Sequence, residues 1–101
     1  MEKLKQHYEL ADIKTAFADP ASFNRSYVSR QGADELDMDD SEVVAIIQAL
    51  TREDFEKSMT SMADHKIWQD VYKPKVGGRT LYVKFTLDAR QALFLISFKE
   101  A

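Results

Sequence analysis

The sequence predicts an α+β domain, in which helices from the first half of the chain pack against an antiparallel sheet from the second half. Apolar residues recur at helical spacing before about residue 50 and alternate with polar residues after about residue 66. Two turn signals, Gly77-Gly78 and Asp88–Gln91, divide the alternating half into strands. At 101 residues the chain has room for one modest core, so residues 1–101 are expected to form a single domain.

The first helix is predicted near residues 9–18. Leu10, Ile13 and Phe17 lie at helical spacing, and Pro20 follows them. Proline ends a helix because its ring clashes with the preceding turn and it has no N–H to donate. This helix is therefore expected to pack its apolar face on the core.

The next stretch gives a weaker pattern before a second helix. Arg25–Val28 is a candidate extended segment, Gly32 a break and Ala33–Leu36 a single helical turn. A wide apolar stripe then predicts a core-packed helix at 41–50. The polar run Asp39–Ser41 supplies candidate N-caps and places negative charge where a helix N-terminus favours it.

Beyond residue 50 the pattern changes to strands. Thr51 and the acidic residue three positions later resemble a capping box, which predicts a short helix carrying Phe55, Lys57 and Ser58, with Lys57 near its end. After that helix the side chains alternate with a period of two. Three strands are predicted, at Ile67–Tyr72, Leu81–Leu87 and Ala92–Lys99.

The composition excludes several classes of protein. The chain has no cysteine, so it has neither a disulfide framework nor a thiolate metal ligand or nucleophile. Its N-terminus lacks the apolar run of a signal peptide, and no stretch reaches the roughly 18 consecutive apolar residues that span a bilayer. We therefore expect a cytoplasmic protein with no membrane partner.

The net charge of −3 conceals a marked asymmetry along the chain. Residues 1–54 carry 6 basic and 12 acidic side chains, whereas residues 55–101 carry 8 basic and 5 acidic ones. Affinity for RNA comes largely from Lys and Arg that neutralise phosphates. The basic second half therefore permits RNA binding, although a solvated face of one sign would give the same composition.

No familiar catalytic or metal-binding motif is present. The sequence lacks a Gly-rich phosphate loop, a Gly-x-Ser-x-Gly elbow and a His-Glu-x-x-His helix. His7 and His65 are far apart, and the acidic run Asp37–Asp40 lacks the glycine and the distal glutamate of an EF-hand loop. We interpret that run as helix capping, and we expect no metal or other cofactor.

Five polar residues stand among otherwise apolar elements, namely Lys57, Gln69, Tyr82, Lys84 and Lys99. Cleaving RNA without a metal requires a base for the 2′-hydroxyl, cationic donors for the charged phosphorane and an acid for the departing 5′-oxygen. Tyrosine and lysine can fill these roles if clustered positive charge lowers a pKa from its usual value of about 10. The alternative is that these residues are solvent-facing partners across a sheet.

Several blocks of the chain resemble one known family. Asp54–Thr60, Asp64–Lys75 and the closing Ile96–Glu100 are similar to the motility quorum-sensing regulator (MqsR) family of type II toxin mRNA interferases. Within the second block, Trp68–Tyr72 is the most specific part. Ala33–Leu36 and the apolar helix after it also fall where the family has similar segments, so the resemblance covers nearly the whole chain.

The resemblance implies a fold, a reaction and a substrate. The fold is a curved antiparallel β-sheet packed by helices, similar to the RelE-like mRNA interferase fold. The reaction is metal-independent cleavage of single-stranded mRNA at GC-containing triplets, with GCU expected, leaving a 2′,3′-cyclic phosphate and a 5′-hydroxyl. The chain departs from the family pattern at Gly77–Arg79 and at Asp88–Gln91, which puts the sequence preference in doubt before the catalysis.

The resemblance also implies an active site made of Lys57, Gln69, Tyr82 and Lys99. Lys57 and Lys99 are assigned to phosphate binding and transition-state charge, with Lys99 a candidate acid, Tyr82 to proton transfer and Gln69 to positioning the nucleotide. The candidate RNA-binding residues are Lys84, His65, Lys73 and Arg79. For His65 the structural interpretation, as a turn or hydrogen-bonding residue, is preferred.

The family resemblance finally implies a partner. The expected inhibitor is a cognate antitoxin with a zinc-binding N-terminal domain and a helix-turn-helix domain, and any DNA contact is expected mainly through that partner. The rival hypothesis is a non-catalytic module that binds RNA or co-regulates transcription with the antitoxin. A third is a plain structural domain, in which the lysines do not converge.

Overall fold

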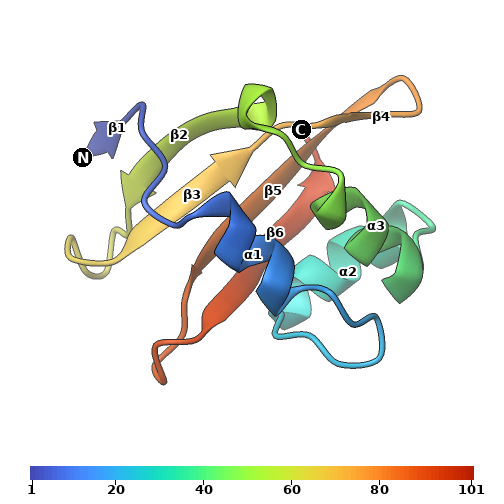
Figure 1. Ribbon diagram of the computed structural model, residues 1–101, viewed down its shortest axis with the longest axis horizontal. Coiled ribbons are helices and arrows are strands. Elements are labelled where there is room, and N and C mark those ends of the chain that lie inside the picture. The colour runs from blue at the N-terminus through green and yellow to red at the C-terminus, as the bar shows by residue number, and fades with distance from the viewer.

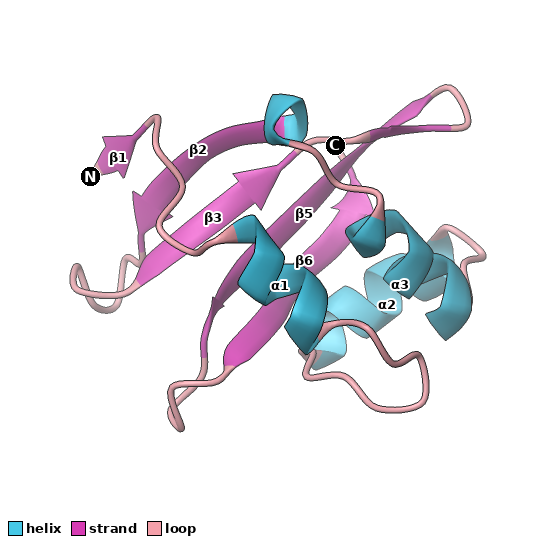
Figure 2. Ribbon diagram, viewed as in Figure 1, coloured by secondary structure: helices cyan, strands magenta, loops and turns pink.

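The computed structural model describes residues 1–101 as helices packed on one antiparallel sheet, which confirms the predicted α+β class. Figures 1 and 2 show this arrangement. The helices are α1 (Leu10–Ala16), α2 (Tyr27–Glu35), α3 (Asp40–Gln48) and the 3-10 turn η1 (Arg52–Asp54). The strands are β1 (Glu2–Lys3), β2 (Phe55–Thr60), β3 (Trp68–Tyr72), β4 (Lys75–Val76), β5 (Arg79–Leu87) and β6 (Leu93–Glu100).

The sheet has β5 at its centre, hydrogen-bonded to β3 on one side and to β6 on the other. From β3 the order continues through β2 to the short edge strand β1, and β4 forms a hairpin with the start of β5. In Figure 1, α1 and α3 lie on the near face of the sheet, whereas α2 lies beside β6 toward the far face. Most of the far face therefore carries no helix.

The core lies between the sheet and α1 and α3. Leu81, Val83 and Phe85 of β5 are fully buried there, together with Ile13 of α1 and Ile47 of α3. Alternate residues of a strand point to opposite faces, so the intervening side chains of β5 must point to the far face. The period-two pattern in the sequence thus separates the core from the open face.

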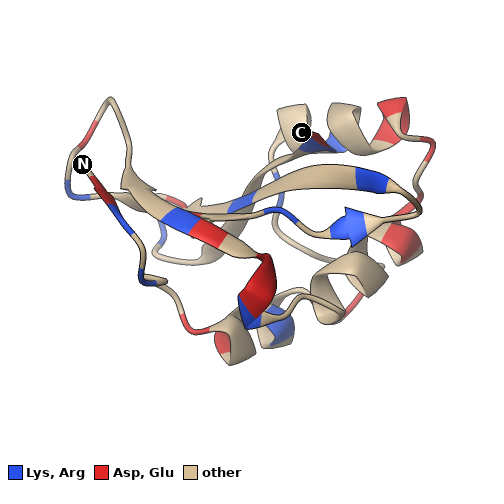
Figure 3. Cartoon of the chain, turned by 90° about the horizontal axis from the view of Figure 1, so that it is seen from above, with Lys and Arg blue, Asp and Glu red and all other residues tan.

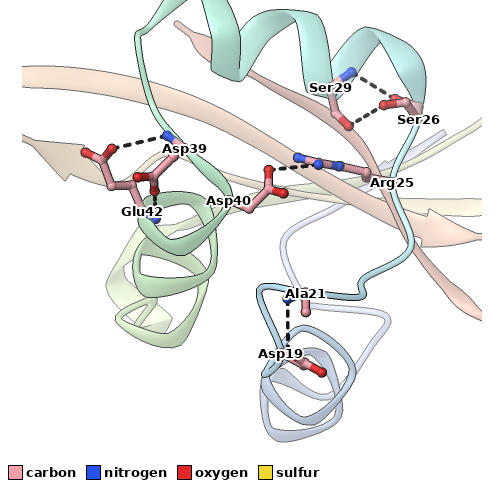
Figure 4. Close-up of polar contacts among 8 residues, drawn as sticks. All are labelled: Asp19, Ala21, Arg25, Ser26, Ser29, Asp39, Asp40 and Glu42. Carbon is pink, nitrogen blue, oxygen red and sulfur yellow. Dashed lines mark hydrogen bonds and ion pairs between the residues drawn. The ribbon is translucent and has the colours of Figure 1, made fainter.

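Local hydrogen bonds explain where the helices begin. Asp39 accepts a hydrogen bond from the backbone N–H of Glu42, and the Glu42 carboxylate accepts one from the N–H of Asp39, which is a capping box. An ion pair of 2.8 Å joins Arg25, just before α2, to Asp40 at the start of α3 (Figure 4). The acidic run is therefore used in capping, as the sequence analysis predicted.

The region before residue 40 is more helical than predicted. Arg25–Val28 is extended only as far as Ser26, and α2 begins at Tyr27. Ser26 caps this helix by accepting a hydrogen bond from the N–H of Ser29. Gly32 is not a break but lies within α2. A Cβ added to Gly32 would lie 1.8 Å from the Phe98 carbonyl oxygen, so the glycine serves close packing of the helix on β6.

Three strands, β1, β2 and β4, lie outside the three predicted ranges, although the Gly77-Gly78 turn that joins β4 to β5 is the predicted one. Phe55, Lys57 and Ser58 belong to β2 and not to a helix, although the capping box of Thr51 and Asp54 does form around η1. A register shift between Phe55 and Lys57 interrupts the alternation that would have marked the strand in the sequence. Strand β1 is only two residues long, too short to give a pattern. No helix is both long and apolar enough to cross a membrane.

A buried carboxylate attaches the N-terminal segment to the sheet. Asp70 is fully buried and accepts hydrogen bonds from the backbone N–H groups of His7 and Tyr8, each at 2.9 Å from Oδ2. The hydroxyl of Ser58 donates to Oδ1 at 2.6 Å. A buried charge is tolerated where hydrogen bonds compensate its lost hydration, so Asp70 holds this segment against β3.

We predict that Gly32→Ala lowers the free energy of unfolding by about 1–3 kcal/mol, because α2 must move away from the Phe98 carbonyl. Urea denaturation measures this change. Arg30→Ala, at an exposed position of the same helix, is the control and should stay within about 0.5 kcal/mol of the natural protein. Equal stabilities for the two variants would contradict the close packing.

We predict that Asp70→Ala destabilises the fold by about 2–4 kcal/mol, because three donors lose a charged acceptor. Ser58→Ala removes one of those donors and should cost only about 1 kcal/mol. Hydrogen exchange of the Tyr8 amide provides a local measurement. If it exchanges no faster in Asp70→Ala than in Ser58→Ala, Asp70 does not anchor this segment.

Candidate active site

The far face of the sheet gathers the lysines that the sequence analysis singled out. Val71 pairs with Lys57 of β2 on one side and with Lys84 of β5 on the other, so the three side chains form one row across three strands. Ser97 of β6 continues this row beside Lys84. Val71 is fully buried, and the two lysines flank it. The side chains of Lys57 and Lys84, distant in sequence, therefore lie on one surface.

Tyr82 lies in the next row of the same face, paired across the strands with Lys99. The Nζ atom of Lys99 is 5.3 Å from the centroid of the Tyr82 ring, and the Nζ atom of Lys84 is 5.7 Å from it. Both ammonium groups are thus within cation–π range of one aromatic ring. Lys84, Lys99 and Tyr82 therefore meet on one surface of the sheet.

Gln69 lies on the same face but on the other side of the central row. It is two residues before Val71 on β3 and pairs with Met59 of β2. Lys57, Lys84 and Val71 therefore separate Gln69 from Tyr82. This placement leaves room for an extended ligand that contacts Gln69 at one end and the Tyr82 row at the other.

Lys57 is held by an ion pair that the sequence did not indicate. The Glu2 carboxylate lies 2.8 Å from the Lys57 Nζ atom, because β1 pairs with the edge of β2. The hydrogen bond and the charge of Glu2 raise the pKa of Lys57 above its ordinary value. The two residues are 55 positions apart and one comes from a two-residue strand, so no local pattern could have revealed the pair.

The surroundings of Lys84 shift its pKa in the opposite direction from that of Lys57. Burial lowers the pKa of its ammonium below the ordinary value, and the positive charge of Lys99 lowers it further. Lowering moves the pKa of a lysine toward neutrality, which increases the fraction of free amine available for proton transfer. The pKa of Lys84 is thus lowered mainly by burial, with a smaller contribution from the neighbouring positive charge of Lys99.

The remaining RNA-binding candidates lie around the lysine face. Lys73, which lies just after the end of β3, forms an ion pair of 2.7 Å with Glu56. Arg79 is exposed at the β4–β5 turn, and His65 is exposed in the turn between β2 and β3. Neither is brought to the Tyr82 ring by any observed contact. No group of three or more His, Asp or Glu side chains is arranged to hold a metal ion.

Figure 3 shows many of the Lys and Arg positions on the strands, whereas many of the Asp and Glu positions lie on the helices and on the turns around α2 and α3. The pairing of the strands, in turn, places Lys57, Lys84 and Lys99 on the far face of the sheet. A basic surface that carries an aromatic ring is a suitable platform for a phosphate backbone and its bases.

Comparison with known proteins identifies the family. The model of a family described as "Motility quorum-sensing regulator, toxin of MqsA" matches residues 5–100. The chain belongs to the motility quorum-sensing regulator family of toxins. It is 35% identical over 100 residues to the mRNA interferase toxin MqsR of Escherichia coli strain K12, and the match covers 99% of each chain. The family resemblance found in the sequence is therefore confirmed.

The far face of the sheet, which carries Lys57, Tyr82, Lys84 and Lys99, can support acid–base chemistry on a phosphodiester. It offers ammonium groups for negative charge, a phenol between two of them, and a lysine whose lowered pKa suits proton exchange. Only α2, beside β6, borders the site, so the rest of this face is open to an extended chain.

We predict that Lys99→Gln raises the pKa of Lys84, because the substitution removes the neighbouring charge that disfavours its ammonium form. NMR titration of the Lys84 side-chain Cε signal measures the change. Lys5→Gln, an exposed lysine of the N-terminal segment, is the control and should leave the Lys84 titration unchanged. A Lys84 pKa that is the same in Lys99→Gln and in the natural protein would contradict the coupling.

Proposed function

We propose that this chain is the toxin of a type II toxin–antitoxin system and acts as a metal-independent endoribonuclease on single-stranded mRNA. The observation that carries the proposal is the convergence of Lys57, Tyr82, Lys84 and Lys99 on the open face of the sheet. Family membership and the name of the E. coli relative, an mRNA interferase toxin, support the same activity.

In the proposed reaction a base removes the proton of a ribose 2′-hydroxyl, and the 2′-oxygen attacks the adjacent phosphorus. The P–O5′ bond breaks as the O2′–P bond forms, and an acid returns a proton to the departing 5′-oxygen. The products are a 2′,3′-cyclic phosphate and a 5′-hydroxyl. The phosphorane carries extra negative charge in the transition state, where positioned ammonium groups are most effective.

Each residue has a role that its position supports. Lys57 and Lys99 bind the phosphate and its developing charge from two sides, and Lys99 is also a candidate acid. Tyr82, in contact with two ammonium groups, transfers protons, and Lys84 is a second proton-transfer group because its pKa is lowered. Gln69, beyond the central row, positions the neighbouring nucleotide.

Glu2 must leave Lys57 before a phosphate can bind there. Both side chains of this ion pair are accessible to solvent, and exposed pairs of this kind contribute little to stability, so an RNA phosphate can replace the carboxylate. The ion pair therefore keeps Lys57 on this face of the sheet while it compensates the charge of the ammonium group.

The finer features of the activity follow the family. We propose cleavage at GC-containing triplets, with GCU preferred. The cognate partner is an antitoxin with a zinc-binding N-terminal domain and a helix-turn-helix domain, which makes the main contacts with DNA. The description of the matching family as the toxin of MqsA supports such a partner. Both proteins act in the cytoplasm, where mRNA is available.

We predict that the purified protein cleaves a defined single-stranded RNA in excess EDTA and leaves cyclic-phosphate ends. Lys57→Ala should lower the rate by about 10²–10³-fold through lost charge stabilisation. Tyr82→Phe should lower it by about 10²-fold or more through lost proton transfer. Mapping of the RNA ends and single-turnover rates measure both effects. Lys5→Ala, which removes a positive charge outside this face, is the control.

Other outcomes distinguish the rival hypotheses. Binding of RNA without cleavage by any form would favour the non-catalytic module that works with the antitoxin. Cleavage at equal rates by Lys57→Ala, Tyr82→Phe and the natural protein would place the chemistry elsewhere. Cleavage abolished by EDTA and restored by a divalent cation would overturn the metal-independent mechanism.

A further inference from the structure

A narrow groove runs between α2 and β6 on the same side of the sheet as the lysine face. Its volume is about 140 Å³. One wall consists of Val28, Gln31 and Glu35, which follow one another at helical spacing on α2. The opposite wall consists of Ser97 and Lys99, which belong to the open face of β6.

The groove exists because α2 packs so closely on β6. Gly32 forms part of the lining, and its missing Cβ allows the helix backbone to approach the Phe98 carbonyl. A larger residue at this position would widen the space. The narrow shape suits a flat group that enters edge first between the helix and the strand.

Lys99 connects the groove to the candidate active site. It lines the groove, and its Nζ atom lies 5.3 Å from the Tyr82 ring centroid. A phosphate held by Lys99 is separated from its own base by a single ribose. A base attached next to that phosphate can therefore reach the groove without leaving the RNA strand.

The groove also offers polar groups that are free to contact a ligand. Glu35 is exposed and forms neither an ion pair nor a side-chain hydrogen bond, and the hydroxyl of Ser97 has no partner. Gln31 donates to the Tyr27 hydroxyl, which leaves its carbonyl oxygen as a further acceptor. Val28, although apolar, is 63% exposed at the mouth of the groove.

A carboxylate beside a phosphate-binding surface repels RNA unless it accepts hydrogen bonds from a base. Guanine is the base that presents two adjacent donors, N1–H and the N2 amino group, along its Watson–Crick edge. The two oxygens of Glu35 match this pair. Adenine, cytosine and uracil each place an acceptor next to their donor, and that acceptor would face the negative charge.

We propose that the α2–β6 groove is a base-binding subsite that holds a guanine next to the cleaved phosphate, with Glu35 accepting hydrogen bonds from its Watson–Crick edge. This inference rests on the proposed ribonuclease function and assigns part of its sequence preference to α2. Single-stranded RNA exposes this edge, because its bases are not paired.

The test compares Glu35→Gln with Asp34→Asn. Asp34 is the neighbouring exposed acid of α2 and does not line the groove, so both variants lose one negative charge from the same helix. The probes are short single-stranded RNAs that contain guanine, or inosine in its place, since inosine lacks the N2 amino group. Cleavage is measured as kcat/KM, and binding by fluorescence anisotropy with RNA blocked by 2′-O-methyl groups.

We expect the natural protein and Asp34→Asn to prefer guanine over inosine at one position of the RNA. Glu35→Gln should lose about 10–100-fold in kcat/KM on the guanine RNA, the equivalent of about 1–3 kcal/mol for a lost bidentate contact. It should also lose most of the preference over inosine. A general gain in RNA affinity, from reduced repulsion, should be equal in the two variants.

The binding measurement separates failure of the groove from failure of the reaction. A guanine preference in binding that depends on Glu35 supports the groove even if no form cleaves RNA, in which case the proposed catalysis fails alone. If Glu35→Gln and Asp34→Asn keep the same preference in both measurements, the groove does not read guanine, while the proposed cleavage is unaffected.

Discussion

The pairing of β5 with β3 and β6 is the constraint on which the rest of the structure depends. Because side chains alternate along β5, Leu81 and Val83 enter the core while Tyr82 and Lys84 are presented on the opposite face. The same hydrogen bonds that build the centre of the sheet fix the spacing of the candidate active site. A shift of one residue would bury the lysines and expose the core.

The elements on either side of this central strand position the other side chains of the site. Asp70, hidden in the core, holds the N-terminal segment against β3 through backbone N–H groups. That attachment accompanies the pairing of β1 with β2, which places Glu2 on Lys57. On the other edge, the fit of Gly32 against Phe98 brings α2 to the side of Lys99. Each side of the sheet therefore places an acidic side chain beside the lysines, Glu2 from β1 and Glu35 from α2.

Electrostatics gives the lysines different properties although they share one surface. Lys57 faces a carboxylate that stabilises its positive charge. Lys84 is partly buried and lies beside Lys99, and both its burial and the charge of Lys99 destabilise its ammonium form. A site with lysines of both kinds can bind a phosphate through one and transfer a proton more readily through the other. This division needs no histidine and fits the cleavage proposed for this chain.

The sequence by itself determined the α+β class, the strands around Val71 and Val83, the Gly77-Gly78 hairpin and the family, because these follow from local periodicity, turn chemistry and motif. It did not reveal β1, β2 or the full length of α2. In β2 a register shift hides the alternation, and in α2 a glycine that resembles a helix break is required by contact with β6. Only the tertiary structure decided which lysines meet Tyr82, which carboxylate holds Lys57 and where the groove opens, because these contacts join residues far apart in the chain.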